Sequence, residues 1–349
     1  MLQRGRGGGW LAAVRDPERG RDDLLTCLRQ DPRLESQEYR SPYYATLAMR
    51  LGVAAEEIAA QGVADEHSLT VSTLAEMAAR GVRVPLPDRV LQGYGVPEWT
   101  RLAAWPADTP AAVALHVPRG ELLASPDLLE RLTTTSDPAE IAVLRDVASN
   151  GQGMPFYLAW EILGRRGDLS LFDRAEAALG TRSMQGAGSR RYFRSLPAPI
   201  ALPLARQWIR LSGGHWAAAA SMLGEHAEPE DVPYLRELLP MVLDWDMDDI
   251  VRALGRVPEL GPYPELSTIY QESCHPFLRG RAAEAMARTD LDFGSRYGFE
   301  CLWDCDSLAR LQGVRFAPMG DEVAQRLREI ATDGSERDDL QAAALSRLS

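Results

Sequence analysis

The stretch that decides the fold covers residues 215–331 and contains WAAAASML at 216–223 and RAAEAMA at 281–287. In the first segment, apolar side chains recur at i, i+3, i+4 and i+7, which is the spacing of one helix face. The residues of this face are Trp216, Ala219, Ala220 and Leu223. Asp, Pro and Gly occupy the intervening turns, and β-branched residues are sparse. The stretch therefore predicts a series of short, half-buried α-helices.

Signals for helix starts recur along the same stretch. Acidic residues supply acceptors to the free amides of a helix N-terminus, and proline is tolerated there because its missing N–H is not needed. Such signals occur at 228–233, His275-Pro276, Asp306-Ser307 and Gly320-Asp321. The pairs Ala218-Ala219 and Ala282-Ala283 lie 64 positions apart (from 218 to 282), which fits two units of 32 residues. We expect helical hairpins that stack, because one hairpin cannot bury its own apolar face.

The two alanine-rich segments resemble the first helix of a HEAT repeat. The resemblance is carried by 216–223 and 281–287 and is clearest over 215–331. It implies an all-α, right-handed α-solenoid of stacked antiparallel helix pairs, of the HEAT/armadillo-like class. It also implies a concave groove of the kind that such proteins use to bind extended partners.

The chain is expected to contain four segments. Residues 1–20 begin with a charged, glycine-rich run that has no apolar region behind it, so we expect a flexible segment and no signal peptide. Helical hairpins are predicted for 21–105, an irregular proline-rich junction for 106–124, and the HEAT-like repeat solenoid for 125–349. No run reaches the ~18 apolar residues that a membrane span requires. We therefore expect a cytoplasmic protein with no membrane partner.

Composition excludes several kinds of chemistry. The sequence contains no lysine, so a Walker A loop, a Schiff-base lysine and pyridoxal-phosphate catalysis are excluded. No GxGxxG, GxSxG or HExxH motif supports a cofactor or a catalytic centre, and we predict neither. Cys274, His275, Cys301 and Cys305 are close in sequence, but without CxxC or HxxxH spacing we assign no metal. The net charge of −12 opposes general nucleic-acid binding.

One basic cluster stands out at 181–194. Its arginines are Arg182, Arg190, Arg191 and Arg194, and they flank the aromatic pair Tyr192 and Phe193. Arginine beside aromatic residues is typical of nucleic-acid or anion binding. The alternative, which we favour, is a solvated loop between repeats.

Two clusters of tryptophan and aspartate are candidates for the groove: Trp245 with Asp246, and Trp303 with Asp304. A carboxylate held against tryptophan could stabilise a developing cation. The HEAT-like DNA glycosylases of the alkylation-repair family imply such an arrangement, but their motif does not match residue by residue. The alternative is that these aspartates cap helices and solvate turns.

The sequence favours a non-catalytic protein-interaction scaffold or adaptor. From net charge alone, an acidic groove would prefer a partner with a basic segment. The competing hypothesis is a nucleic-acid binder, or a glycosylase-type enzyme, that uses the arginine cluster and the tryptophan–aspartate pairs.

Overall fold

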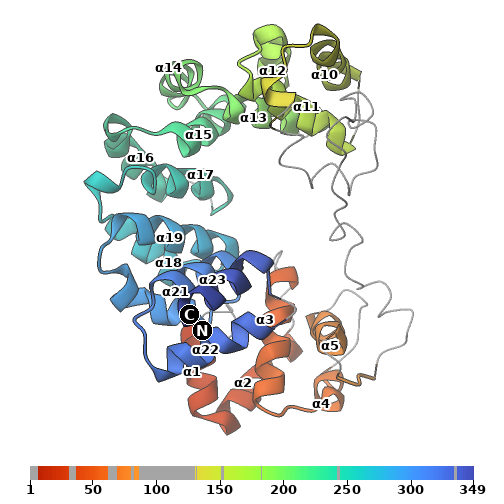
Figure 1. The fold of residues 1–349 in the computed structure, drawn as a ribbon, viewed down its shortest axis with the longest axis vertical. Helices are drawn as coiled ribbons and strands as arrows, with labels where there is room; N and C mark the ends of the chain where they lie inside the picture. Colours follow the sequence, from red (N-terminus) through yellow and green to blue (C-terminus); the bar gives the residue numbers. More distant parts are fainter. Residues whose placement is uncertain are drawn as a thin grey trace. The chain divides into compact units, whose positions relative to one another are not determined.

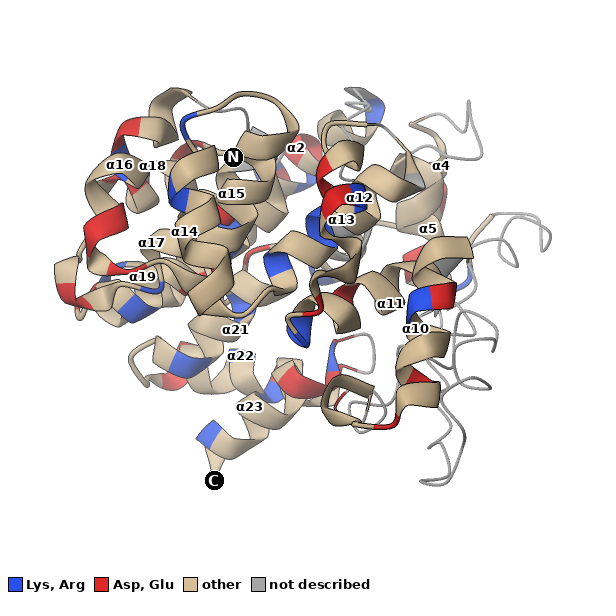
Figure 2. Ribbon diagram, turned by 90° about the horizontal axis from the view of Figure 1, so that it is seen from above, with Lys and Arg blue, Asp and Glu red and all other residues tan. Residues whose placement is uncertain are grey.

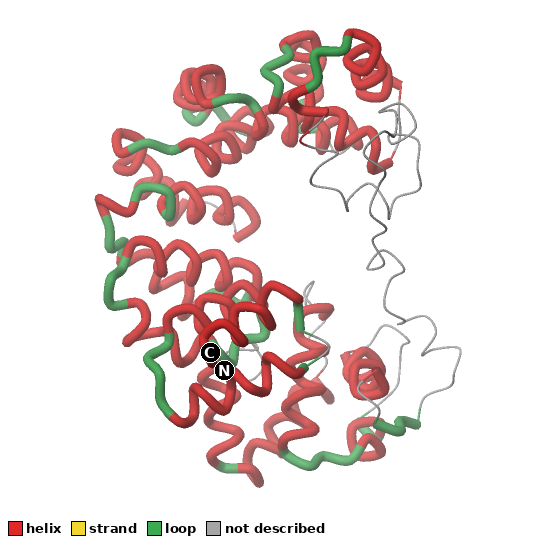
Figure 3. The backbone as a smooth tube through the Cα atoms, viewed as in Figure 1, coloured by secondary structure: helices red, strands yellow, loops and turns green. Residues whose placement is uncertain are grey.

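The computed structural model describes residues 7–30, 37–61, 69–79, 82–85, 130, 132–150, 153–181, 183–241, 244–333 and 336–349. Over these residues the regular structure is helical and contains no strand (Figure 3), which confirms the predicted all-α class. None of the helices described has the length and apolarity needed to cross a membrane.

The chain folds into two compact units. Unit 1 combines the two ends of the chain, Met1–Gly95 and Pro258–Ser349, and unit 2 is the stretch between them, Val96–Val257. This division differs from the predicted one, because helices from both ends of the chain share one core. The predicted junction at 106–124 lies outside the described residues.

Unit 2 is built of paired helices. They are α10 (Pro138–Asn150), α11 (Gly153–Arg165), α12 (Phe172–Ala178), α13 (Met184–Ser195), α14 (Ala198–Trp208), α15 (Gly214–His226), α16 (Val232–Leu238) and α17 (Asp244–Leu254). Helices α11, α13, α15 and α17 pack side by side in chain order (Figure 1). Each of α10, α12, α14 and α16 packs on one member of this row.

The core between α11 and α13 combines aromatic side chains with glycines. Trp160 is fully buried, and its indole Nε1 donates a hydrogen bond to the carbonyl of Ala148 at 2.8 Å. A Cβ at Gly164 would lie 2.5 Å from the carbonyl oxygen of Tyr192, and a Cβ at Gly188 would lie 2.8 Å from Phe156. Glycine at both positions therefore lets the two helices approach closely.

Unit 1 contains helices from both ends of the chain. They are α1 (Gly7–Arg15), α2 (Pro17–Gln30), α3 (Gln37–Arg50), α4 (Ala55–Ala59), α5 (Leu69–Ala79), α18 (Pro264–Glu272), α19 (Pro276–Thr289), α20 (Phe299–Cys301), α21 (Ser307–Phe316), α22 (Asp321–Thr332) and α23 (Asp338–Leu348). Helices α19, α21 and α23 pack in order, with α18 on α19 and α22 on α23.

The N-terminal helix α1 docks on the C-terminal helices. Trp10 is only 4% exposed, stacks on Trp303 with ring centroids 5.8 Å apart, and meets the ring of Tyr43 edge-on at 5.4 Å. Residues 7–20 were predicted to be flexible, but all of them except Asp16 belong to α1 or α2. The apolar face of α1 supplies the reason: Trp10 and Ala13 are both buried in the core of unit 1.

Candidate functional site

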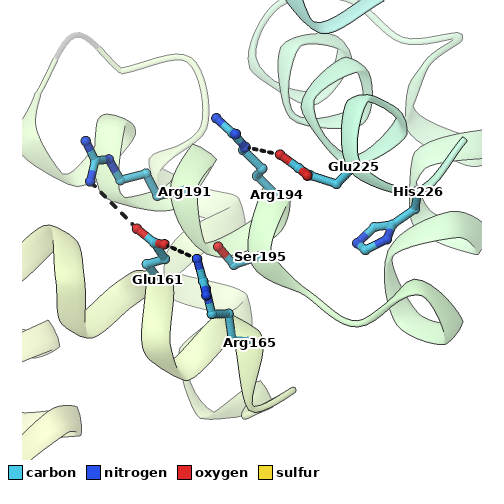
Figure 4. A pocket seen from close by; sticks show the side chains of 7 residues that line it. All are labelled: Glu161, Arg165, Arg191, Arg194, Ser195, Glu225 and His226. Atoms are coloured by element: carbon cyan, nitrogen blue, oxygen red, sulfur yellow. Dashed lines mark hydrogen bonds and ion pairs between the residues drawn. The ribbon is translucent and has the colours of Figure 1, made fainter. Parts of the chain in front are cut away.

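A pocket of about 600 Å³ lies in unit 2 across three consecutive members of the helix row (Figure 4). Its lining residues are Glu161 and Arg165 from α11, Arg191, Arg194 and Ser195 from α13, and Glu225 and His226 from α15. Three arginines and two glutamates give this lining a positive balance, in contrast to the chain as a whole.

Helix α13 positions two of the arginines by its periodicity. Arg191 and Arg194 are three positions apart and are exposed on one face, whereas Tyr192 and Phe193 are fully buried on the other. Ser183 begins the helix by accepting a hydrogen bond from the backbone N–H of Gly186 at 3.3 Å. The expectation of a loop at 181–194 is therefore wrong for residues 184–194, which are helical.

Each glutamate of the pocket is shared by two arginines. Glu161 Oε1 lies 2.7 Å from Arg165 Nη2, and Glu161 Oε2 lies 3.8 Å from Arg191 Nη1. Glu225 Oε1 accepts a hydrogen bond from Arg194 Nε at 2.7 Å and a second one from Arg252 Nη1. In Figure 4, Arg191 points toward Glu161 and Arg194 toward Glu225.

The electrostatic environment keeps Glu225 ionised. Partial burial opposes its charge, but the hydrogen bond from Arg194 and the nearby guanidinium groups of Arg252 and Arg256 lower its pKa below the usual value. The imidazole of His226 is also engaged, with Nε2 2.8 Å from the carbonyl oxygen of Leu196. The ionised Glu225 and the arginines therefore give the pocket fixed charges.

Basic and acidic residues are interspersed over the described helices (Figure 2). A local excess of arginine therefore arises only where particular side chains converge. Tyr157 of α11 contacts one of these arginines: the guanidinium carbon of Arg191 lies 5.2 Å from the centroid of the Tyr157 ring. This contact supports the Arg191 side chain at the rim of the pocket.

The structure brings together only part of the predicted arginine cluster. Arg191 and Arg194 line the pocket, Arg190 is exposed on α13 without lining it, and Arg182 lies outside the described residues. Sequence reasoning missed the remaining lining residues, which are Glu161, Arg165, Ser195, Glu225 and His226. The only local signal for them was the i, i+4 spacing of Glu161 and Arg165, which is typical of a helix ion pair.

The two predicted tryptophan–aspartate clusters lie in different units, and the side chains of Trp245 and Asp246 lie outside the described residues. The backbone of Trp245 and Asp246 belongs to α17 in unit 2. Trp303 and Asp304 belong to unit 1 and are only 7% and 2% exposed. Both are core residues, so the prediction that they face a groove is wrong.

Cys301 and Cys305 of unit 1 are buried thiols. Cys301 Sγ donates a hydrogen bond to the hydroxyl oxygen of Tyr270 at 3.3 Å. Burial raises the pKa of both Cys301 and Cys305, the latter to about 12, so their thiolates are disfavoured as metal ligands or nucleophiles. Within the described ranges, no three His, Cys, Asp or Glu side chains are grouped so that they could hold a metal ion.

Comparisons with known proteins do not assign a family. No family model matches the sequence, and no match is found among curated proteins or solved structures. Any function must therefore be argued from the residues and the geometry of the pocket.

Proposed function

We propose that the chain is a non-catalytic protein-interaction scaffold of the HEAT-like α-solenoid type. The side-by-side packing of α11, α13, α15 and α17, each with a partner helix, supports this class, because stacked hairpins pack in this way. Successive helices of such a row provide a continuous surface for an extended partner. The pocket spans three of these helices.

The charge of the pocket carries the proposal for the partner. Arg165, Arg191 and Arg194 each keep 46% of the side chain exposed, so their guanidinium groups are accessible. We propose that they bind an acidic segment of a partner protein. The basic partner expected from net charge does not suit this pocket, because local complementarity and not total charge decides what binds at a given surface.

Two observations favour this function over its competitors. The stacking of nucleic-acid bases on Tyr192 and Phe193 that the sequence suggested is excluded, because both rings are fully buried in the helix core. Glu225 is held ionised by Arg194 and Arg252, so it is not suited to act as a general acid near neutral pH.

Affinity capture from the native host tests the proposal. The full chain is compared with a pocket variant, Arg165→Glu/Arg191→Glu/Arg194→Glu. The control variant is Arg19→Glu/Arg288→Glu/Arg337→Glu, which reverses the same charge at three exposed arginines in local ion pairs outside the pocket. All captures are repeated after nuclease treatment.

The expected result is one protein, retained in stoichiometric amount by the wild-type chain and the control but lost by the pocket variant. Its capture survives nuclease and weakens with added salt, because salt screens exposed charges. Loss of the captured species on nuclease treatment, or equal capture by both variants, contradicts the proposal.

A further inference from the structure

We infer that Arg191 and Arg194 bind a phosphoryl group carried on a side chain of the partner protein. The inference rests on the proposed function and specifies its ligand, because it makes the acidic segment a phosphorylated one. Its structural basis is that each glutamate of the pocket contacts two arginines.

At each glutamate, one of the two arginines can turn toward a ligand while the other stays paired with the carboxylate. Glu161 keeps its close contact with Arg165 at 2.7 Å if Arg191, which is 3.8 Å away, turns toward a ligand. Glu225 keeps its hydrogen bond from Arg252 if Arg194 turns away. Neither glutamate is then left without a cation, so recruiting these two arginines avoids the cost of an unpaired, partly buried carboxylate.

Exposure distinguishes the anchoring partner from the mobile one at Glu225. Arg252 is only 12% exposed and also contacts Asp248 and Asp249 on its own helix. Arg194 is 46% exposed. The better-buried guanidinium therefore holds Glu225, and the more exposed one is accessible to a ligand.

A phosphomonoester matches the two released guanidinium groups. Arg191 and Arg194 lie three positions apart on α13, on the same face of the helix and within one turn of it. A phosphoryl group carries a charge of about −1.5 to −2 and three acceptor oxygens, so it can accept from two arginine forks at once. A carboxylate has one charge and two oxygens, which one fork already satisfies.

The size of the pocket indicates that the phosphoryl group arrives on a larger molecule. Its volume of about 600 Å³ lies within the ~300–1,000 Å³ that pockets for drug-sized ligands occupy. A free phosphate ion would fill a small part of this space. Room therefore remains for residues that flank a phosphorylated side chain, next to the hydroxyl group of Ser195 and the guanidinium of Arg165.

Binding of defined peptides to the full chain tests the inference. Three fluorescent heptapeptides of glycine and serine are compared by anisotropy: one with a central phosphoserine, one with serine there, and one with two glutamates. We expect the phosphopeptide to bind at least about tenfold more tightly than the glutamate peptide, because one phosphoryl group offers both arginines a higher charge and three acceptor oxygens at a single centre. Arg191→Ala and Arg194→Ala should each lower its affinity at least about tenfold.

Arg190→Ala is the matched control, because Arg190 is an exposed arginine of the same helix that does not line the pocket. It should leave the affinity unchanged. Equal binding of the phosphopeptide and the glutamate peptide would overturn the phosphoryl inference, and so would phosphopeptide binding that is indifferent to Arg191→Ala and Arg194→Ala. Inorganic phosphate that binds as tightly as the phosphopeptide would overturn the assignment to a partner side chain.

The failure of this inference differs from failure of the proposed function. If the captured partner depends on the pocket arginines but binds equally after phosphatase treatment, the scaffold proposal holds and the phosphoryl group is excluded. If no captured protein depends on the pocket arginines, both proposals fail.

Discussion

Arg279 and Asp304 form a completely buried, two-fold hydrogen-bonded ion pair in unit 1. Arg279 Nε donates to Asp304 Oδ2 at 3.1 Å, and Arg279 Nη2 donates to Asp304 Oδ1 at 3.0 Å. Neither side chain has any exposed surface. Burial opposes the charge on Arg279, but the adjacent Asp304 carboxylate raises its pKa, and the pair ties α19 to the turn before α21.

Breaking this pair should destabilise unit 1 strongly. Arg279→Ala leaves the Asp304 carboxylate buried without its cation, and we expect the free energy of unfolding to fall by about 3–5 kcal/mol. The double change Arg279→Met/Asp304→Leu should cost less, because it removes both charges of the pair and leaves neither one unpaired. Urea unfolding followed by circular dichroism measures both.

Arg288→Ala provides the control for that experiment. Arg288 lies on the same helix, α19, but is 51% exposed and pairs with Glu284 across one turn. Such surface pairs are worth about 0–1 kcal/mol. A loss of stability in Arg279→Ala no larger than in Arg288→Ala would show that the buried pair is not a determinant of the fold.

Trp10→Ala should detach α1 from unit 1. The indole of Trp10 lies against Trp303 and Tyr43, and the guanidinium of Arg326 is 4.6 Å from the Trp303 ring centroid in the same cluster. Removing a buried tryptophan side chain costs about 3–5 kcal/mol. Hydrogen exchange should therefore accelerate over residues 7–15. Trp10→Phe keeps a ring in the cluster and should protect these residues far better; equal exchange in both variants would argue against docking through Trp10.

Local signals in the sequence were enough to place several helix starts. Helix α19 begins at Pro276 after His275, and α21 begins at Ser307 with Asp306 as its N-cap, both as predicted. Each start is set within a few residues by proline or by a side-chain acceptor. The spacing of apolar residues at i, i+3, i+4 and i+7 is also a local signal, and it predicts which side of a helix is buried.

Such local signals do not predict contacts between segments that are distant in the sequence. The docking of Trp10 on Trp303 joins residues from opposite ends of the chain, and no periodicity within either segment indicates it. Gly188 lies in the segment that was expected to be a loop, but in the structure it allows α13 to lie close to Phe156 of α11. Only part of the candidate site could be predicted from the sequence for this reason. Arg191 and Arg194 are close together in the sequence, whereas Glu225 comes from another helix.

Asp306 should make stability depend on pH. Burial, and next the charge of Asp304, raise the pKa of Asp306 to about 6 in the folded protein, against about 3.9 in an unfolded chain. The folded state therefore binds this proton more tightly. The resulting stabilisation is complete below about pH 4 and is lost as pH rises through about 6.

Asp306→Asn isolates this effect. Asparagine keeps an acceptor for the backbone N–H groups of Leu308 and Ala309, which Asp306 caps at 2.9 and 3.1 Å, but it does not titrate. The stability of the variant relative to wild type should rise by about 2 kcal/mol between pH 4 and pH 7. Urea unfolding at several pH values measures the difference, and a flat difference curve would exclude Asp306 as the titrating group.

Glu225→Gln should strengthen binding of the phosphopeptide. Glu225 competes with a bound anion for Arg194, and its negative charge repels that anion. Glutamine keeps the shape of the side chain and removes the charge, while Arg252 retains Asp248 and Asp249 as partners. We expect a gain in affinity of about fivefold, since a hydrogen bond to a charged group no longer has to be exchanged.

Glu237→Gln is the control variant, because it makes the same change of net charge away from the pocket. Glu237 is exposed on α16 and does not line the pocket. That variant should bind the phosphopeptide as the wild-type chain does, because an exposed charge away from the site is largely screened at physiological ionic strength. Anisotropy titrations of both variants provide the comparison. If Glu225→Gln weakened binding instead, Glu225 would be holding Arg194 in its binding position rather than competing for it, and the release of Arg194 from Glu225 could not be part of recognition.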